Sequence, residues 1–296
     1  MTSNIEAHQV PAGAPSTEPR RQKGGRRRRW STTGTVGAVL VGAVVVIGVV
    51  SLFYLPYPAA QLGGGRLAGP SAQHLLGTDA LGRDLLSQFM VGARIALLAG
   101  AGSAALGGTL GIVVGLAAAF WKTWADDGAA AVLDVLIAFP SLLLAMLVVA
   151  ARGATLGSAI LAIGLAIAAI VARLTRILAK RVLGRQFVLA ARTSGTGWFG
   201  IIRRHILPNI WPTLAVIVAL QFGLAVLAEA SLSYLGLGAP PPNASWGSLL
   251  HQAQGTVYVA PLGAIMPGIG LVVLVLGVNL LADGMQDAFD PVGGRR

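Results

Sequence analysis

The residues that could carry chemistry are few and widely spaced. The four histidines, His8, His74, His205 and His251, lie far apart and have no H-E-x-x-H spacing, so no metal site is predicted. The chain has no cysteine, which excludes disulfides, thiolate metal sites and cysteine catalysis. Lys122 is the only lysine followed by serine or threonine, and a tryptophan precedes it where a phosphate-binding loop needs glycine. The sequence therefore predicts no catalytic residues, no Ser-His-Asp set and no nucleotide site of its own.

One polar stretch stands between two long apolar segments, at residues 186–208. It contains Arg192, Arg203 and Arg204, and each arginine at the centre of a membrane helix costs roughly 2.5 to 3.5 kcal/mol on insertion scales. The stretch is therefore expected to protrude from the membrane. The apolar residues of this stretch would then also lie outside the membrane.

The same stretch is too apolar for a simple linker. Its pattern predicts a first short helix, a turn at two glycines and a second short helix that Pro208 limits. The residues behind this prediction are Phe187, Val188, Ala191, Gly195, Gly197, Trp198, Ile201, Ile202 and His205. Such a helix-turn-helix has an apolar face that needs a partner, either the other helices of this chain or a second protein. An interfacial amphipathic loop without a special role is the alternative interpretation.

Two acidic residues lie within the apolar segments and are candidates for a functional role. Asp134 and Glu229 both fall near the ends of predicted spans, whereas an ion-driven carrier would place its acids near the midplane. Each is interpreted as a helix-packing or gate contact. Pro140 should bend its helix, either as a fixed packing kink or as part of a gate.

Composition identifies the class of protein. Of the 296 residues, 55% are hydrophobic and only 11% are charged, while a soluble domain would carry about a quarter charged residues. Apolar runs of about 20 residues recur, long enough to cross a bilayer. We predict an all-α polytopic membrane protein with six transmembrane helices. The formal charge of +11 is assigned to topology signals and contact with membrane lipid, and no nucleic acid is expected as a partner.

Six spans and their connections follow along the chain. Residues 1–33 form a disordered basic cytoplasmic tail. The first span, 34–55, is favoured over a cleaved signal peptide because its core is long and no A-x-A site follows. Residues 56–91 form an extracytoplasmic connector and amphipathic helix, residues 92–285 a five-helix core that contains the 186–208 loop, and residues 286–296 a cytoplasmic tail. The later spans are expected at about 94–120, 128–150, 158–171, 210–235 and 259–281, with a basic helical extension after the fourth.

Local signals refine three of these elements. Thr78 or Asp79 is expected to cap the amphipathic helix, with Leu81, Leu85 and Phe89 along one stripe. In the second span, small residues recur every four positions and should let helices approach closely. They are Gly107, Gly111 and Gly115, and on a second line Gly100, Ala104 and Gly108. Trp246 is expected to act as an interfacial anchor in the connector before the sixth span.

Positive charge sets the orientation. Lysines and arginines gather in the N-terminal tail, in the loop after the second span, between Arg173 and Arg204 and at the C-terminus, with four elsewhere. By the positive-inside rule the basic side is cytoplasmic. Both termini and the 186–208 stretch are therefore expected inside the cell, and the regions 78–84 and 240–246 outside.

Several motifs resemble one family. The sequence G-T-D-x-x-G-R-D, followed by G-A-R, is similar to the C-type permease subunit of dipeptide, oligopeptide and nickel ABC importers. Its residues here are Thr78, Asp79, Gly82, Arg83, Asp84 and Arg94. The stretch 186–208 resembles the "EAA" loop of these permeases through Ala190, Ala191, Arg192, Gly195, Trp198, Arg203, Arg204, Ile206, Leu207 and Pro208. Leu189 stands where the family usually has glutamate, so an ion pair from that acid is missing. Segments around Glu229 and Pro240 to Trp246 are similar to the same family.

The resemblance implies a type I importer fold in the bacterial inner membrane, in which the loop carries a coupling helix. It implies a second homologous permease, two cytoplasmic ABC ATPase subunits that bind ATP and magnesium, and an extracytoplasmic substrate-binding protein. This chain would bind no cofactor itself. The expected cargo is a di- or oligopeptide, with nickel or haem as alternatives within the architecture and an autonomous ion-coupled carrier as the alternative of another class.

Overall fold

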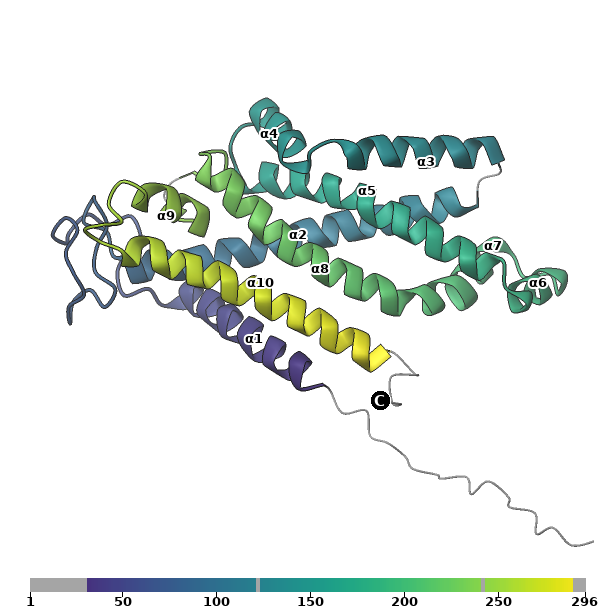
Figure 1. The fold of residues 1–296 in the computed structure, drawn as a ribbon, viewed down its shortest axis with the longest axis horizontal. Coiled ribbons are helices and arrows are strands. Elements are labelled where there is room, and N and C mark those ends of the chain that lie inside the picture. Colours follow the sequence, from purple (N-terminus) through teal and green to yellow (C-terminus); the bar gives the residue numbers. More distant parts are fainter. Residues whose placement is uncertain (1–30, 121–122, 241–242, 290–296) are drawn as a thin grey trace, which may run out of the picture.

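The protein is an elongated helical bundle (Figure 1). The computed structural model describes residues 31–120, 123–240 and 243–289, and no strand occurs within them. The helices are α1 (Thr32–Phe53), α2 (Leu85–Ala119), α3 (Thr123–Ala138), α4 (Ser141–Arg152), α5 (Leu156–Leu183), α6 (Gln186–Thr193), α7 (Trp198–Ile201), the π-helical turn η1 (Ile202–Ile206), α8 (Leu207–Tyr234), α9 (Trp246–Ala253) and α10 (Leu262–Phe289). The predicted all-α polytopic class is confirmed.

Helix α2 is the centre of the bundle, and its small residues explain why. A Cβ at Gly111 would lie 2.6 Å from the Cβ of Val171 on α5. A Cβ at Gly100 would lie 2.8 Å from Val226 on α8. The two predicted lines of small residues therefore serve two neighbours, one for α5 and one for α8, because small side chains let helices approach closely in lipid.

Helices α1 and α10 form a second close pair along one flank. Gly37 of α1 lies against the backbone of Leu281, and Gly277 of α10 lies against Leu40. The start of α1 and the end of α10 therefore lie side by side, toward the end of the bundle that carries α6 and α7 (Figure 1). α9 lies at the opposite end. We refer to these as the α6 end and the α9 end.

The predicted bounds of several spans need correction. α2 begins at Leu85 and has no separate amphipathic helix before it, since the connector helix and the second span are one helix. α5 continues through the basic residues to Leu183, as expected. α10 runs on to Phe289, into the segment assigned to the C-terminal tail. Residues 1–30 and 290–296, which hold most of both predicted tails, lie outside the described residues.

The predicted third span is broken and is not one straight helix. α3 and α4 meet at an angle of 84° around Phe139 and Pro140. Pro140 lacks the amide hydrogen that a continuing helix needs, and its ring restricts the residue before it. Within the described residues, five helical segments are long and apolar enough to cross a membrane, and the bent pair is a sixth candidate.

Trp246 is not an interfacial anchor. Its side chain is only 1% exposed, and its indole nitrogen donates a hydrogen bond to the carbonyl of Phe89 at 3.0 Å. Gly92 and Gly270 leave the slot that the ring fills, because a Cβ at either position would collide with it. The tryptophan therefore locks α9 onto α2 and α10.

Candidate docking segment

Residues 186–206, called here the docking segment, form a tight reversal at the α6 end. Helix α6 ends at a glycine in the left-handed conformation, Gly195, with φ of +82°. The amide of Thr196 donates to the carbonyl of Ala191 and that of Gly195 to Arg192, both at 3.0 Å. This pair of hydrogen bonds is the Schellman motif at the end of a helix, which favours glycine at this position. The predicted turn is confirmed, and Gly195 has a defined backbone role.

One side of the docking segment is buried in the bundle. Val188, Ile201 and Ile206 are at most 1% exposed. They belong to one apolar cluster whose other buried members are Ala119 of α2, Ala179 of α5, and Ile210 and Leu214 of α8. The segment is thus packed against three long helices at once.

Aromatic contacts add to this attachment. The ring of Trp198 meets that of Phe120, the residue that follows α2, edge-on at 4.9 Å between centroids. The guanidinium of Arg192 lies 4.3 Å from the centre of the Trp198 ring, within the range of a cation–π contact. Arg192 is thereby held against the turn while its charge stays at the surface.

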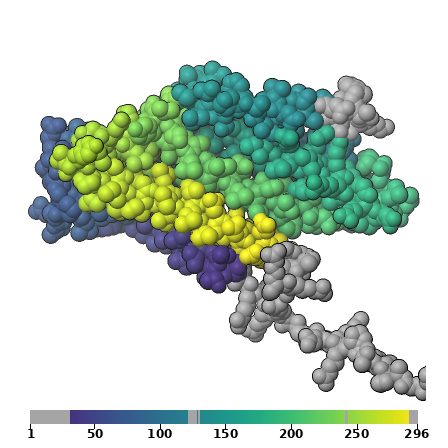
Figure 2. All heavy atoms as spheres, in the orientation of Figure 1, coloured from purple at the N-terminus to yellow at the C-terminus, as the bar shows by residue number. Residues whose placement is uncertain are grey.

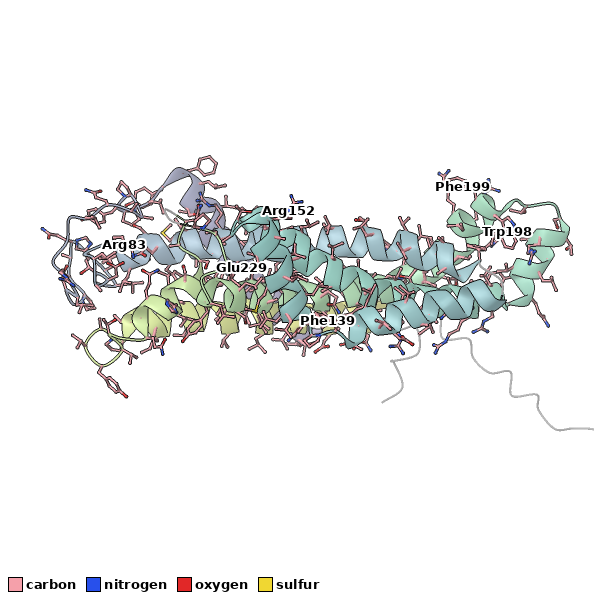
Figure 3. All side chains as sticks on the ribbon, turned by 90° about the horizontal axis from the view of Figure 1, so that it is seen from above. Arg83, Phe139, Arg152, Trp198, Phe199 and Glu229 are labelled. Carbon is pink, nitrogen blue, oxygen red and sulfur yellow. The ribbon has the colours of Figure 1, made fainter. Side chains whose placement is uncertain are left out.

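The other side of the docking segment is an exposed apolar surface with a basic border. Phe199 is 76% exposed and Leu189 61%, with Phe187 and Trp198 about half exposed. Figure 3 shows Trp198 and Phe199 at the far end of the molecule from Arg83. The border and nearby surface consist of Ala190, Arg192, Arg203 and Arg204, all exposed. Such a surface suits a groove lined by apolar and acidic side chains.

Pro208 does not end the second helix, contrary to the prediction. The helix that begins at Trp198 continues through η1 into α8, and Leu207 and Pro208 form the first turn of α8. Proline is tolerated there because the π-helical turn changes the register of the hydrogen bonds. The side-chain amide of Asn209 donates to the carbonyl of His205 at 2.6 Å. The second helix of the docking segment thus continues directly into α8, a candidate membrane span.

The motif residues 78–84 gather at the α9 end of the molecule. Asp79 accepts hydrogen bonds from the amides of Leu81 and Arg83, from the Arg83 guanidinium at 2.7 Å and from the Gln88 side chain. Burial raises the pKa of Asp79, but these donors outweigh it and hold the pKa below its ordinary value of 3.8. Arg83 also donates to Gln252 of α9. The motif ties the connector to α9.

Asp84, not Thr78 or Asp79, caps the helix that follows. Its carboxylate accepts from the amide and the hydroxyl of Ser87, both at 2.8 Å, and pairs with His74 at 3.0 Å. Thr78 instead joins two turns of the connector through its hydroxyl. Gly82, with φ of +79°, lies directly against Gly64. These contacts make the motif a folded cap on the α9 end.

Arg94 is not part of this cluster. It lies further along α2, half-buried, and its backbone passes close to Gly48 of α1. The resemblance groups it with the motif only by position in the sequence.

The two intramembrane acids have different surroundings. Glu229 is 1% exposed and accepts a hydrogen bond from Ser233 at 2.6 Å, with Ser245 of the α9 cap also in reach. This contact favours the packing interpretation. Asp134 is more than half exposed and forms an ion pair with Arg173 of α5 at 3.2 Å. Pro140 lies exposed at the break between α3 and α4.

Four polar partners of the motif residues and of Asp134 were not predicted from the sequence. His74, Gln88, Gln252 and Arg173 complete the clusters around Asp84, Asp79, Arg83 and Asp134. Neither periodicity nor a local motif marks them. Their roles follow only from how the connector, α2, α5 and α9 fold against one another.

Comparisons with known proteins agree with this architecture. Residues 85–292 match the family described as binding-protein-dependent transport system inner membrane component. The chain is 39% identical over 223 residues to the glutathione transport system permease protein GsiD of Pectobacterium atrosepticum, which covers 75% of this chain and 74% of that protein. It is 36% identical over 268 residues to the protein of the same name from Escherichia coli O1:K1, covering 90% and 88%.

Proposed function

The chain belongs to the family of inner membrane components of binding-protein-dependent transport systems, and we propose that it works as the subunit that couples a cytoplasmic ATPase to peptide import. It is a permease subunit of the dipeptide and oligopeptide ABC importer class and a multi-pass inner membrane protein. The finer assignments below extend from this point.

The exposed surface of the docking segment carries the proposal. Phe199 and Leu189 present apolar area to the outside, while Val188, Ile201 and Ile206 are buried against α2, α5 and α8. A force on the exposed side is therefore transmitted to three long helices. Apolar surface with a basic border is typical of a protein-binding site.

The proposed coupling role requires partner chains. We assign ATP and magnesium to two separate ATPase subunits, each of which would hold one permease by its docking segment. A second homologous permease would complete the translocation pathway, and an extracytoplasmic binding protein would deliver the cargo to the α9 end. With Leu189 in place of the family's glutamate, docking here depends on apolar contact and on Arg192, Arg203 and Arg204 more than on an acidic side chain.

The orientation rests on charge. The α6 end carries exposed arginines and is assigned to the cytoplasm by the positive-inside rule, which also places the start of α1 and the end of α10 there. The α9 end, with the Asp79 and Asp84 clusters, is assigned to the outside.

The cargo is proposed to be a short peptide. The relatives named above are described as glutathione permeases, and glutathione is a tripeptide. Uptake of labelled glutathione, a dipeptide and nickel by cells with and without this chain would test the assignment. Loss of nickel uptake with unchanged peptide uptake would contradict it.

The coupling role is tested by one substitution at the exposed tip. Phe199→Asp should weaken retention of the ATPase by roughly 30-fold, because losing a central apolar anchor costs about 2 kcal/mol. Tyr258→Asp is the matched control, since Tyr258 is a fully exposed aromatic in the loop between α9 and α10. The measurement is ATPase recovered with the tagged permease from detergent. Equal recovery with both variants would refute the proposal.

A further inference from the structure

The break between α3 and α4 lies at the surface of this chain. Residues 138–141 are all exposed, and Phe139 is 48% exposed. Figure 3 shows Phe139 at the edge of the bundle, between the Arg83 end and the Trp198 end. Together, residues 130–138 of α3 and helix α4 are long and apolar enough to be a candidate membrane span. Irregular backbone at membrane depth is tolerated where it is covered by protein or lines a water-filled cavity, and it does not occur against lipid.

An ion pair between α3 and α5 lies close to the break. Asp134 and Arg173 are 3.2 Å apart, and their side chains are 55% and 48% exposed. A carboxylate has no long apolar stem with which to reach a distant headgroup, unlike arginine. A half-exposed ion pair in hydrocarbon would be costly, and such residues usually face the bundle interior or a water-filled cavity. The broken helix and the ion pair are therefore both unfavourable next to lipid.

The opposite flank has the reverse character. The outer surfaces of α1 and α10 carry exposed aliphatic side chains, among them Val39 at 66% and Val272 at 62%. α1 contains no charged residue, and the charges of α10, Asp283 and Asp287, lie in its last two turns. Both helices are unbroken. Figure 2 shows the α1–α10 flank and the α3–α4 edge on opposite sides of the molecule.

We propose that the α3–α4 edge faces the water-filled translocation pathway between this chain and the second transmembrane subunit, and that the α1–α10 flank faces lipid. This inference rests on the proposed function, which supplies the second subunit. In secondary transporters, broken helices at the interface between repeats commonly form the substrate site. Phe139 and the Asp134–Arg173 pair would then be exposed to passing cargo or to its water.

The test uses the absence of cysteine from the chain. Val135, 70% exposed on α3, is changed to cysteine, and Phe139→Cys is a second variant at the break. Val39→Cys and Val272→Cys are matched controls on α1 and α10, similar in exposure and in residue type. Val39 is nearer to the first residue of α1 than Val135 is to the first residue of α3, and both helices start toward the α6 end. Val39 therefore also controls for access of the reagent from the membrane surface.

Membranes containing the assembled transporter are treated with a small sulfonate-bearing methanethiosulfonate, which does not enter lipid. V135C and F139C should react at least about ten times faster than V39C and V272C, because only a hydrated thiol ionises readily. Rates at V135C and F139C no higher than at the controls would overturn the inference.

The same preparation separates this inference from the proposed function. ATPase that stays bound while V39C and V272C react faster would overturn the inference and leave the coupling role intact. Fast reaction at V135C and F139C in a preparation that never retains an ATPase would leave the water-facing edge supported and refute the coupling role.

Discussion

Two glycines in one turn separate conformational need from simple lack of space. No atom lies within 4 Å of a Cβ placed at Gly195 or at Gly197, but only Gly195 has a positive φ. Side chains would fit at both positions. The difference between them is therefore a property of the backbone alone.

Gly195→Ala should destabilise the docking turn by about 1 to 2 kcal/mol, since residues with a Cβ disfavour the left-handed region. The expected result is reduced ATPase-driven uptake with normal amounts of permease in the membrane. Gly197→Ala is the control and should transport like the wild type. Equal activity of both variants would mean that the turn does not need this geometry.

The Asp79 cluster predicts a pH dependence with a defined sign. Because the pKa of Asp79 is lowered in the folded protein, its contribution to stability is present above its unfolded pKa and is lost as pH falls through the lower folded value. The cap at the α9 end should thus stay folded down to about pH 4 and open only in stronger acid. Protease cleavage of the 56–84 connector at several pH values measures this.

Asp79→Asn should make the connector more sensitive to protease at neutral pH, with a cost of about 1 to 3 kcal/mol for the broken charged hydrogen bonds. It should also flatten the acid dependence. An unchanged acid profile would show that another group controls opening.

At the scale of elements, the sequence predicts packing better than it predicts where helices begin and end. The four-residue repeat of small residues on α2 correctly indicated close approach, because that signal depends on side-chain size alone. Two boundaries were wrong for physical reasons. Asp84 competes with Thr78 and Asp79 as a cap, and only the folded connector selects it. Pro208 fits in a first helical turn as well as after a last one.

Buried positions in the candidate sites depended on contacts that no local pattern contains. Trp246 has the composition of an interfacial anchor, but the slot left by Gly92 and Gly270 buries it. Pro140 correctly predicted a bend, whereas its 84° angle depends on how α4 packs on α5. The apolar stripe of the docking segment was correct in kind, and its division into buried and exposed residues required the three neighbouring helices.

The contact between α2 and α5 predicts a specific loss of stability. Gly115→Ala would place a methyl group against the backbone of Ala172 on α5, and such overpacking typically costs about 1 to 3 kcal/mol. Gly42→Ala on α1 is the control, because no atom lies near its Cβ. Thermal denaturation in detergent should show a lower midpoint for the first variant alone. A midpoint equal to that of the control would mean that α2 and α5 can move apart at Gly115 without loss of stability.

At the scale of the whole molecule, the two ends are held together by different kinds of contact. The α9 end is held by hydrogen bonds among the connector, α2 and α9, and the α6 end by apolar packing with an exposed tip. The orientation of the chain in the membrane can be tested with one residue at each end. Leu75 and Leu189 are similarly exposed at opposite ends, at 64% and 61%.

Leu75→Cys should react with a membrane-impermeant maleimide in intact cells, whereas Leu189→Cys should react only in inverted vesicles, because the basic side is expected inside. The absence of other cysteines makes each signal unambiguous. The reverse pattern would place the docking segment outside the cell and would remove the ATPase from the mechanism.

The helix that starts at Trp198 and ends at Tyr234 runs for 37 residues, about 55 Å at 1.5 Å per residue. Tyr234 donates to Gln254 at 3.1 Å, and Ser245 lies in reach of Glu229, so the far end of this helix is also attached to the residues that flank α9. A beam of that length that pivots at its middle by about 5° swings each tip by about 2 Å. Very small strokes of the motor would thus be felt across the full thickness of the membrane, at the mouth where cargo arrives.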